Sequence, residues 1–121
     1  TGRFRWRYPA FEHLPLAQED ILNFCLDPAY AHTLTWPDDY WPADAAPPSA
    51  EAWTESVASY TQARQAIQRL ARDVADLTAT VPTGTAKQTY LRAILLSLDH
   101  AAYHVGQIVA VRRALGSWPV A

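Results

Sequence analysis

The sequence predicts an all-α fold in a single domain that spans residues 1–121. Apolar residues recur at steps of three and four over three long segments, which is the period of an amphipathic helix. No stretch alternates apolar and polar residues for long enough to predict a strand. Half of the residues are apolar, so the chain can bury one real core and is not of disordered composition.

The first helix is predicted from about Pro9 to Leu26. Pro9 suits a first turn, where its missing N–H is not needed. Pro15 lies inside the segment and removes one helical hydrogen bond, so we expect a kink there or a helix start nearer His13. The apolar stripe consists of Leu14, Ala17, Ile21, Leu22 and Cys25.

A linker over residues 27–50 follows and holds five of the nine prolines. Its aromatic residues Trp36, Tyr40 and Trp41 need apolar surroundings, so we expect the linker to pack across the helices. These rings could also cover a pocket, although ordinary aromatic packing is the simpler interpretation.

The second helix is predicted to begin after Ser49, a good N-cap, and to run to about Thr78. Glu51 lies in its first turn, where the helix dipole favours a negative charge. One buried stripe is expected along it, and Pro82 and Gly84 then break the chain. The stripe consists of Trp53, Val57, Tyr60, Ile67, Leu70, Val74 and Leu77.

The third helix is predicted from Lys87 or Thr89 to Leu115, with Gly116 after its end and Pro119 as a stop. It has two apolar faces, so both should be buried and only a strip with Arg92, Asp99 and Arg113 should be solvated. One face holds Leu91, Ile94, Leu95, Leu98, Val105 and Val109, and the other holds Ala93, Ser97, His100, His104, Ile108 and Val111. Three helices provide too few partners for such a helix. We therefore expect a missing N-terminal helix or a partner subunit, and predict a homodimer or higher oligomer.

His100 and His104 are four residues apart and share one face of the third helix. Such a pair is either half of a divalent-metal site or two core histidines bonded to backbone or hydroxyl groups. His13 can face the interior from the first helix and is the candidate third ligand, whereas His32 in the linker is expected to be exposed. The pair lacks the glutamate of a metallopeptidase motif, so peptide hydrolysis has no candidate base there.

Three segments resemble the DinB-like helical-bundle superfamily: EHLPLAQEDILNF, WPDDYWP and DHAAYHVGQIVAVRRALGSWP. The resemblance extends from Glu12 to Pro119 in the family order. It implies a DinB-like four-helix bundle, here without its N-terminal helix. It also implies a divalent metal ion held by His13, His100 and His104, with one position open to solvent. Zinc or nickel are the leading metals, with iron or manganese as alternatives.

Two functions follow from this resemblance. One is a metal-dependent transferase or hydrolase in which the ion activates a low-molecular-weight thiol or water for reaction with a small-molecule substrate. The alternative is a non-catalytic metal-binding or dimerisation module of the stress-response type. The residues provide no Ser/His/Asp or Cys/His arrangement that would favour another reaction.

Three residues near the histidines have weaker assignments. Gln107 could bond a metal-bound water or fix a histidine tautomer, or be a buried amide bonded to backbone. Asp99 points about 100° away from His100 and is expected to pair with an arginine. Cys25 is about 18 Å from His13 along an ideal helix and is expected in the core.

Composition argues against some partners. The net charge of -2 gives no basic field for nucleic acid, and the alternating run Arg3–Tyr8 is too short to provide one. No apolar run reaches the roughly 20 uninterrupted residues of a membrane span, and no secretory signal is visible. With its lone Cys25, the chain is expected to be cytoplasmic and to bind neither nucleic acid nor membrane.

Overall fold

The computed structural model describes residues 7–44 and 46–119, with side chains from His13 onward. It contains α1 (Arg7–Leu26), the short 3-10 helix η2 (Asp38–Tyr40), α2 (Ala50–Asp73) and α3 (Tyr90–Ala114). No β-strand occurs within these residues, so the all-α prediction of three main helices is confirmed.

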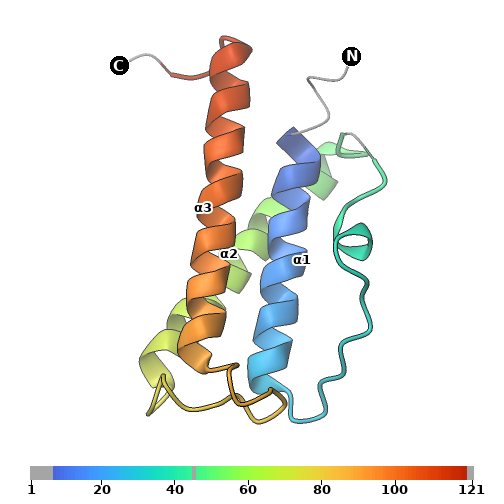
Figure 1. The fold of residues 1–121 in the computed structure, drawn as a ribbon. Helices are drawn as coiled ribbons and strands as arrows, with labels where there is room; N and C mark the ends of the chain where they lie inside the picture. Colours follow the sequence, from blue (N-terminus) through green and yellow to red (C-terminus); the bar gives the residue numbers. More distant parts are fainter. Residues whose placement is uncertain (1–6, 45, 120–121) are drawn as a thin grey trace.

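The three long helices form a bundle in which α1 is central (Figure 1). α1 and α2 run in the same general direction and α3 runs back beside them. α1 packs extensively on both α2 and α3, which contact each other much less. The linker after α1 returns along this helix, as Figure 1 shows, and carries η2 toward its N-terminal half.

The apolar core lies in the half of the bundle where α1 ends and α3 begins. Two groups of buried side chains fill it, contributed by all three helices and the loop before α3. Val81 in that loop is fully buried, and its N–H donates to the Gln88 carbonyl at 2.8 Å. The buried members are Leu22, Cys25, Ala63, Ile67, Leu70, Val81 and Ala93.

Helix boundaries follow local capping chemistry. The Ser49 hydroxyl accepts from the Ala52 N–H at 3.0 Å, and the Thr89 hydroxyl accepts from the Arg92 N–H at 3.1 Å. Gly116, just after α3, has φ of 66°, a conformation that favours glycine. The predicted starts at Ser49 and Thr89 and the predicted end near Leu115 are confirmed.

α1 begins at Arg7 and continues through Pro15, so the expected later start near His13 is wrong. A mid-helix proline removes one hydrogen bond and crowds the preceding turn, at about 3 kcal/mol. Pro15 and the nearby Leu14 and Ala17 are buried, and the free energy gained by this burial offsets part of the cost.

The predicted end and buried stripe of α2 are wrong in part. α2 ends at Asp73, five residues before Thr78, and the next turn is held by Asp76, whose carboxylate accepts from the Thr78 N–H and hydroxyl. This local bonding competes with helix continuation. Trp53 and Val57 are 40% and 38% exposed, whereas Ile67 and Leu70 further along the stripe are buried.

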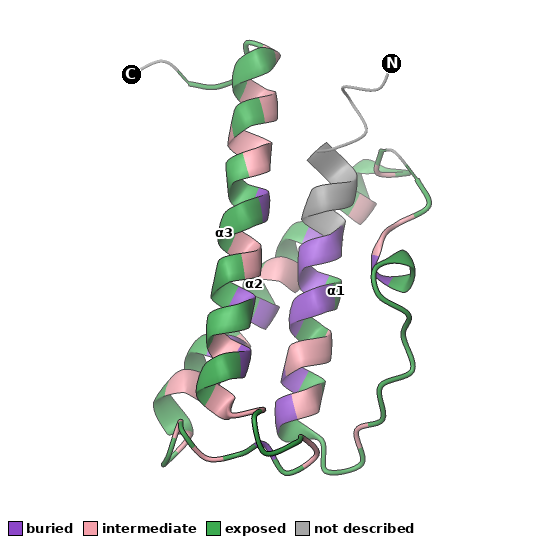
Figure 2. Ribbon diagram, in the orientation of Figure 1, coloured by how far each residue is buried: buried purple, intermediate pink, exposed green. Residues whose placement is uncertain are grey.

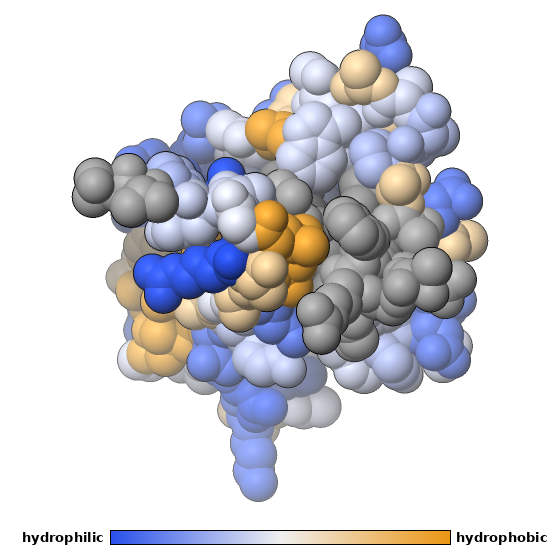
Figure 3. Space-filling view, turned by 90° about the horizontal axis from the view of Figure 1, so that it is seen from above, coloured by the Kyte–Doolittle hydropathy of each residue, from blue (hydrophilic) through white to orange (hydrophobic). Residues whose placement is uncertain are grey.

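The third helix is covered mainly on one face, contrary to the prediction that both apolar faces are buried, and on the other predicted face Ile94 packs against the core. Figure 2 shows its covered side toward α1 and its exposed side away from the bundle. The exposed side includes Leu91, Leu95, Leu98 and Val105. Apolar residues also lie among charged ones at the end of the bundle where α3 finishes (Figure 3).

By length and composition α3 is apolar enough to cross a membrane, with a mean hydropathy of 1.2 over a stretch that is 11% buried. A single helix of this kind is weak evidence for a membrane span. The expectation that the chain has no membrane partner therefore stays a prediction.

Candidate metal centre

Three histidines from two helices meet above the apolar core. His13 of α1 and His104 of α3 are 0% and 4% exposed, and His100 of α3 is partly buried. The Nε2 atom of His100 lies 2.8 Å from Nε2 of His13 and 3.0 Å from Nε2 of His104. The structure therefore brings together the three residues that the sequence predicted as ligands.

Hydrogen bonds on the far side of two rings fix their tautomers. His13 donates from Nδ1 to the Tyr40 carbonyl at 2.9 Å, and His104 donates from Nδ1 to Oε1 of Gln107 at 2.8 Å. Each neutral ring then has a lone pair on Nε2, directed at His100. The His100 Nε2–H can donate fully to only one of them, so the three nitrogens lack a mutually satisfied arrangement without a cation.

Two of the three nitrogen separations are close to the spacing that a metal ion requires, and all three ligand atoms lie within 4.8 Å of one another. Zinc–nitrogen bonds of 2.0–2.1 Å in tetrahedral geometry separate two ligand atoms by about 3.3 Å. The observed separations from His100 of 2.8 and 3.0 Å would increase by only a few tenths of an ångström. Outer hydrogen bonds such as those of His13 and His104 are typical of metal-ligating imidazoles.

The surroundings keep these imidazoles neutral. Burial lowers the pKa of His13 and of His104. Burial, together with the charges that His13 and His104 would carry, also lowers the pKa of His100 to about 4. A neutral imidazole has the lone pair that a metal ion needs, so near pH 7 the cluster is in its ligand form.

The linker provides an aromatic wall for His13, which confirms that it packs on the helices. The Trp41 ring stacks on His13 with centroids 4.3 Å apart, and the Trp36 ring lies 5.3 Å away. Tyr40 is 3% exposed and its hydroxyl donates to Asp20 of α1 at 2.6 Å. These contacts hold the Tyr40 carbonyl in position to accept from His13.

The cluster is open on the side of His100. A solvent-accessible cavity of about 580 Å³ lies between α1, α3 and the linker, and its lining includes Trp36, Asp99, His100 and Tyr103. His13 and His104 do not line it. A cation bound by the three Nε2 atoms would therefore have one accessible side.

Neither a family model, a curated protein nor a solved structure matches this chain. The metal centre consequently rests on the geometry described above. The DinB-like assignment stays a prediction.

The other sequence-predicted residues lie outside the cluster. The His32 side chain is 54% exposed and 3.7 Å from Asp20, and Cys25 is buried in the core, both as predicted. Asp99 has no ion pair within the described residues, so its expected pairing with an arginine is not found there. In the run Arg3–Tyr8, residues 3–6 and all six side chains lie outside what the structure describes.

Sequence reasoning missed two groups of the site. The Tyr40 carbonyl is a backbone atom, and no residue type announces its role as an acceptor for His13. Trp41 was considered as a cover, and its stacking on His13 could be found only from how the linker folds back. By contrast, the position of Gln107 one turn after the histidine pair did indicate its role in fixing a tautomer.

Proposed function

We propose that this protein binds one divalent metal ion through Nε2 of His13, His100 and His104. The observation that carries the proposal is the pair of Nδ1 hydrogen bonds, to the Tyr40 carbonyl and to Gln107, which leave two Nε2 lone pairs directed at a third imidazole. A set of three imidazoles suits zinc or nickel, with iron or manganese as alternatives.

We further propose a DinB-like arrangement for the domain. Its support is the order of the ligands along the chain, with one histidine on the first helix and two at a four-residue spacing on the last. The bundle packing of α1 against α3 agrees with that arrangement.

The chemistry that we propose is metal-dependent group transfer or hydrolysis. A bound cation held only by neutral imidazoles would lower the pKa of a coordinated thiol or water. The open side at His100 supports catalysis over storage, because a small molecule can reach it through the adjoining cavity. The alternative is a non-catalytic metal-binding or dimerisation module, which differs in having no turnover with any metal.

The first test is metal content. Protein purified without an affinity metal and incubated with zinc should retain about one ion per chain in elemental analysis. His100→Ala should lose most of it, whereas His32→Ala, which changes an exposed histidine outside the cluster, should not. Equal metal content in all three proteins would contradict the site.

The second test addresses catalysis. Protein loaded with zinc, nickel, manganese or iron is assayed for thiol addition to an electrophile and for ester hydrolysis. Turnover that disappears in His104→Ala supports an enzyme. Full loading without turnover with any of the four metals supports the binding-module alternative.

We also propose that a second copy of the chain covers the exposed face of α3. Leu91, Leu95, Leu98 and Val105 follow the alternating steps of four, three and seven that form a seam between paired helices. Their exposed fractions are 38%, 52%, 65% and 47%. Light scattering should show a dimer at micromolar concentration, and Leu98→Glu should give a monomer; a wild-type monomer would contradict the proposal.

A further inference from the structure

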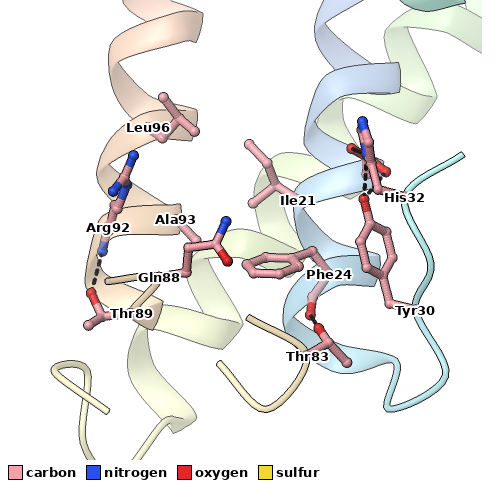
Figure 4. A pocket seen from close by; sticks show the side chains of 11 residues that line it. Ile21, Phe24, Tyr30, His32, Thr83, Gln88, Thr89, Arg92, Ala93 and Leu96 are labelled. Carbon is pink, nitrogen blue, oxygen red and sulfur yellow. Dashed lines mark hydrogen bonds and ion pairs between the residues drawn. The ribbon is translucent and has the colours of Figure 1, made fainter. Parts of the chain in front are cut away.

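A groove extends along α3 from the histidine cluster toward the start of the helix. The cavity beside His100 adjoins a second one of about 460 Å³, and the two share Asp20, Ile21, His32 and Leu96 in their walls. Figure 4 shows the second cavity, with Arg92 and Leu96 on α3 facing Ile21 and His32. A ligand that reaches His100 can therefore extend along α3 into the second cavity.

The two ends of the groove differ in charge. Beside His100 the wall has the carboxylate of Asp99, and the carboxylate of Asp20 lies on the wall that both cavities share. At the far end it has Arg92, whose guanidinium has no carboxylate within ion-pair distance among the described residues. Arg92 is the one Lys or Arg side chain on either wall within the described part of the chain.

The far end also has hydrogen-bonding groups and an apolar approach. Gln88 and Thr89 line the cavity beside Arg92, as Figure 4 shows. Between the two ends the wall is formed in part by Ile21 and Leu96, which line both cavities. A guanidinium next to polar groups is suited to bind a carboxylate through two parallel hydrogen bonds.

From this arrangement we propose that the groove binds a small anionic molecule with a metal-binding head, an apolar body and a carboxylate tail. The head would lie at the histidine cluster and the tail at Arg92, so this inference rests on the proposed function. Arg92 and His100 are eight residues apart on one helix, which is about 12 Å at the usual rise. Asp99 lines only the cavity beside His100 and would repel a carboxylate near the metal ion, which favours this orientation.

The test uses cobalt-loaded protein and ω-mercaptoalkanoic acids of increasing chain length. Coordination of the thiolate to cobalt gives an absorption band, from which a dissociation constant is obtained. Affinity should reach a maximum at a chain that spans the groove. At that length the acid should bind roughly tenfold or more tightly than the mercaptoalcohol of equal length, because the alcohol lacks a charged partner for Arg92.

Arg92→Gln should reduce the affinity of the optimal acid to that of the alcohol and leave the alcohol and the cobalt content unchanged. Arg92 is exposed, so this change should not affect folding. Arg113→Gln, also exposed on α3 but outside both cavities, is the matched control and should bind as wild type.

The outcomes separate the two proposals. The groove inference alone would be overturned if the protein takes up cobalt but binds acids and alcohols of every length equally well. It would also be overturned if Arg92→Gln weakens the binding of the acid and of the alcohol to the same extent. Failure of the protein to take up cobalt would overturn the proposed function and this inference with it.

Discussion

The two long faces of α3 show opposite relations between polarity and burial. On the face toward α1, Ser97 and His104 are 3% and 4% exposed. On the opposite face, Leu95 and Leu98 are 52% and 65% exposed. Buried imidazole nitrogens without a donor for their lone pairs cost free energy in an isolated chain, and so do large exposed apolar surfaces. The contrast agrees with the two partners proposed above, a cation on one face and a second copy of the chain on the other.

The largest expected effect concerns the histidine face. A ligand that binds only the folded state stabilises it by about 4 kcal/mol at a thousandfold excess over its dissociation constant. For a domain of this size, zinc should therefore raise the melting temperature by roughly 10–25 °C over the protein in chelator, as followed by circular dichroism.

His13→Ala should abolish this difference, because it removes the one ligand from α1. A wild-type melting temperature that is the same in zinc and in chelator would contradict the metal-binding role of this face.

The second prediction compares one substitution at neighbouring positions on the two faces. Ser97→Glu places a carboxylate at a position that is 3% exposed, and the cost of burying this charge should lower the free energy of unfolding by about 3 kcal/mol or more. Leu98→Glu, on the exposed face, should change the free energy of unfolding of the monomer by less than about 0.5 kcal/mol.

Urea denaturation at concentrations where the protein is monomeric measures both values. Leu26→Glu, at a position of similar exposure (62%) outside α3, controls for the added charge. Equal losses at positions 97 and 98 would show that the two faces do not differ as described.

A smaller effect is expected at the group that orients His104. Gln107→Ala removes the acceptor of the His104 Nδ1–H and should weaken zinc affinity about 10–100-fold without loss of the site. Competition with a chromogenic chelator measures this affinity. Gln65→Ala, at an exposed position of α2, is the control and should leave the zinc affinity unchanged. An unchanged zinc affinity in Gln107→Ala would contradict a role for this hydrogen bond.

The smallest expected effect is the pH dependence of the metal-free protein. The folded-state pKa of His100 is about 4 against an ordinary 6.5, because of burial and of His13 and His104, with a weak opposing effect of Asp99. Between these two values the unfolded state binds more protons, so the free energy of unfolding should fall as the pH falls from 6.5 toward 4. His100→Ala should flatten the slope in this window. A free energy of unfolding of the wild-type protein that increases as the pH falls from 6.5 toward 4 would contradict a buried, neutral His100.

Local chemistry made much of the fold predictable from the sequence. Ser49 and Thr89 cap their helices through bonds to residues three positions later, and Gly116 follows α3 with a positive φ, so short-range patterns were enough. The histidine spacing on α3 and the apolar flanks of His13 likewise indicated these three imidazoles as candidates, and the family resemblance implied that they form one site.

The remainder depended on tertiary contacts. Periodicity does not reveal which of two apolar faces of α3 packs on α1, and the sequence could not show that Leu98 stays exposed. The end of α2 at Asp73 depends on the competing turn at Asp76. The Tyr40 carbonyl at His13 arises from the path of a linker with no helical period, so its position could not be predicted.

The most direct test is the position of a metal ion in crystals of the zinc-loaded protein, located by anomalous diffraction at the zinc edge. We predict one strong peak about 2.0–2.1 Å from Nε2 of His13, His100 and His104, with its open side toward the cavity beside His100. A fully loaded crystal with no peak between these three nitrogens, or with the ion held elsewhere, would contradict the account.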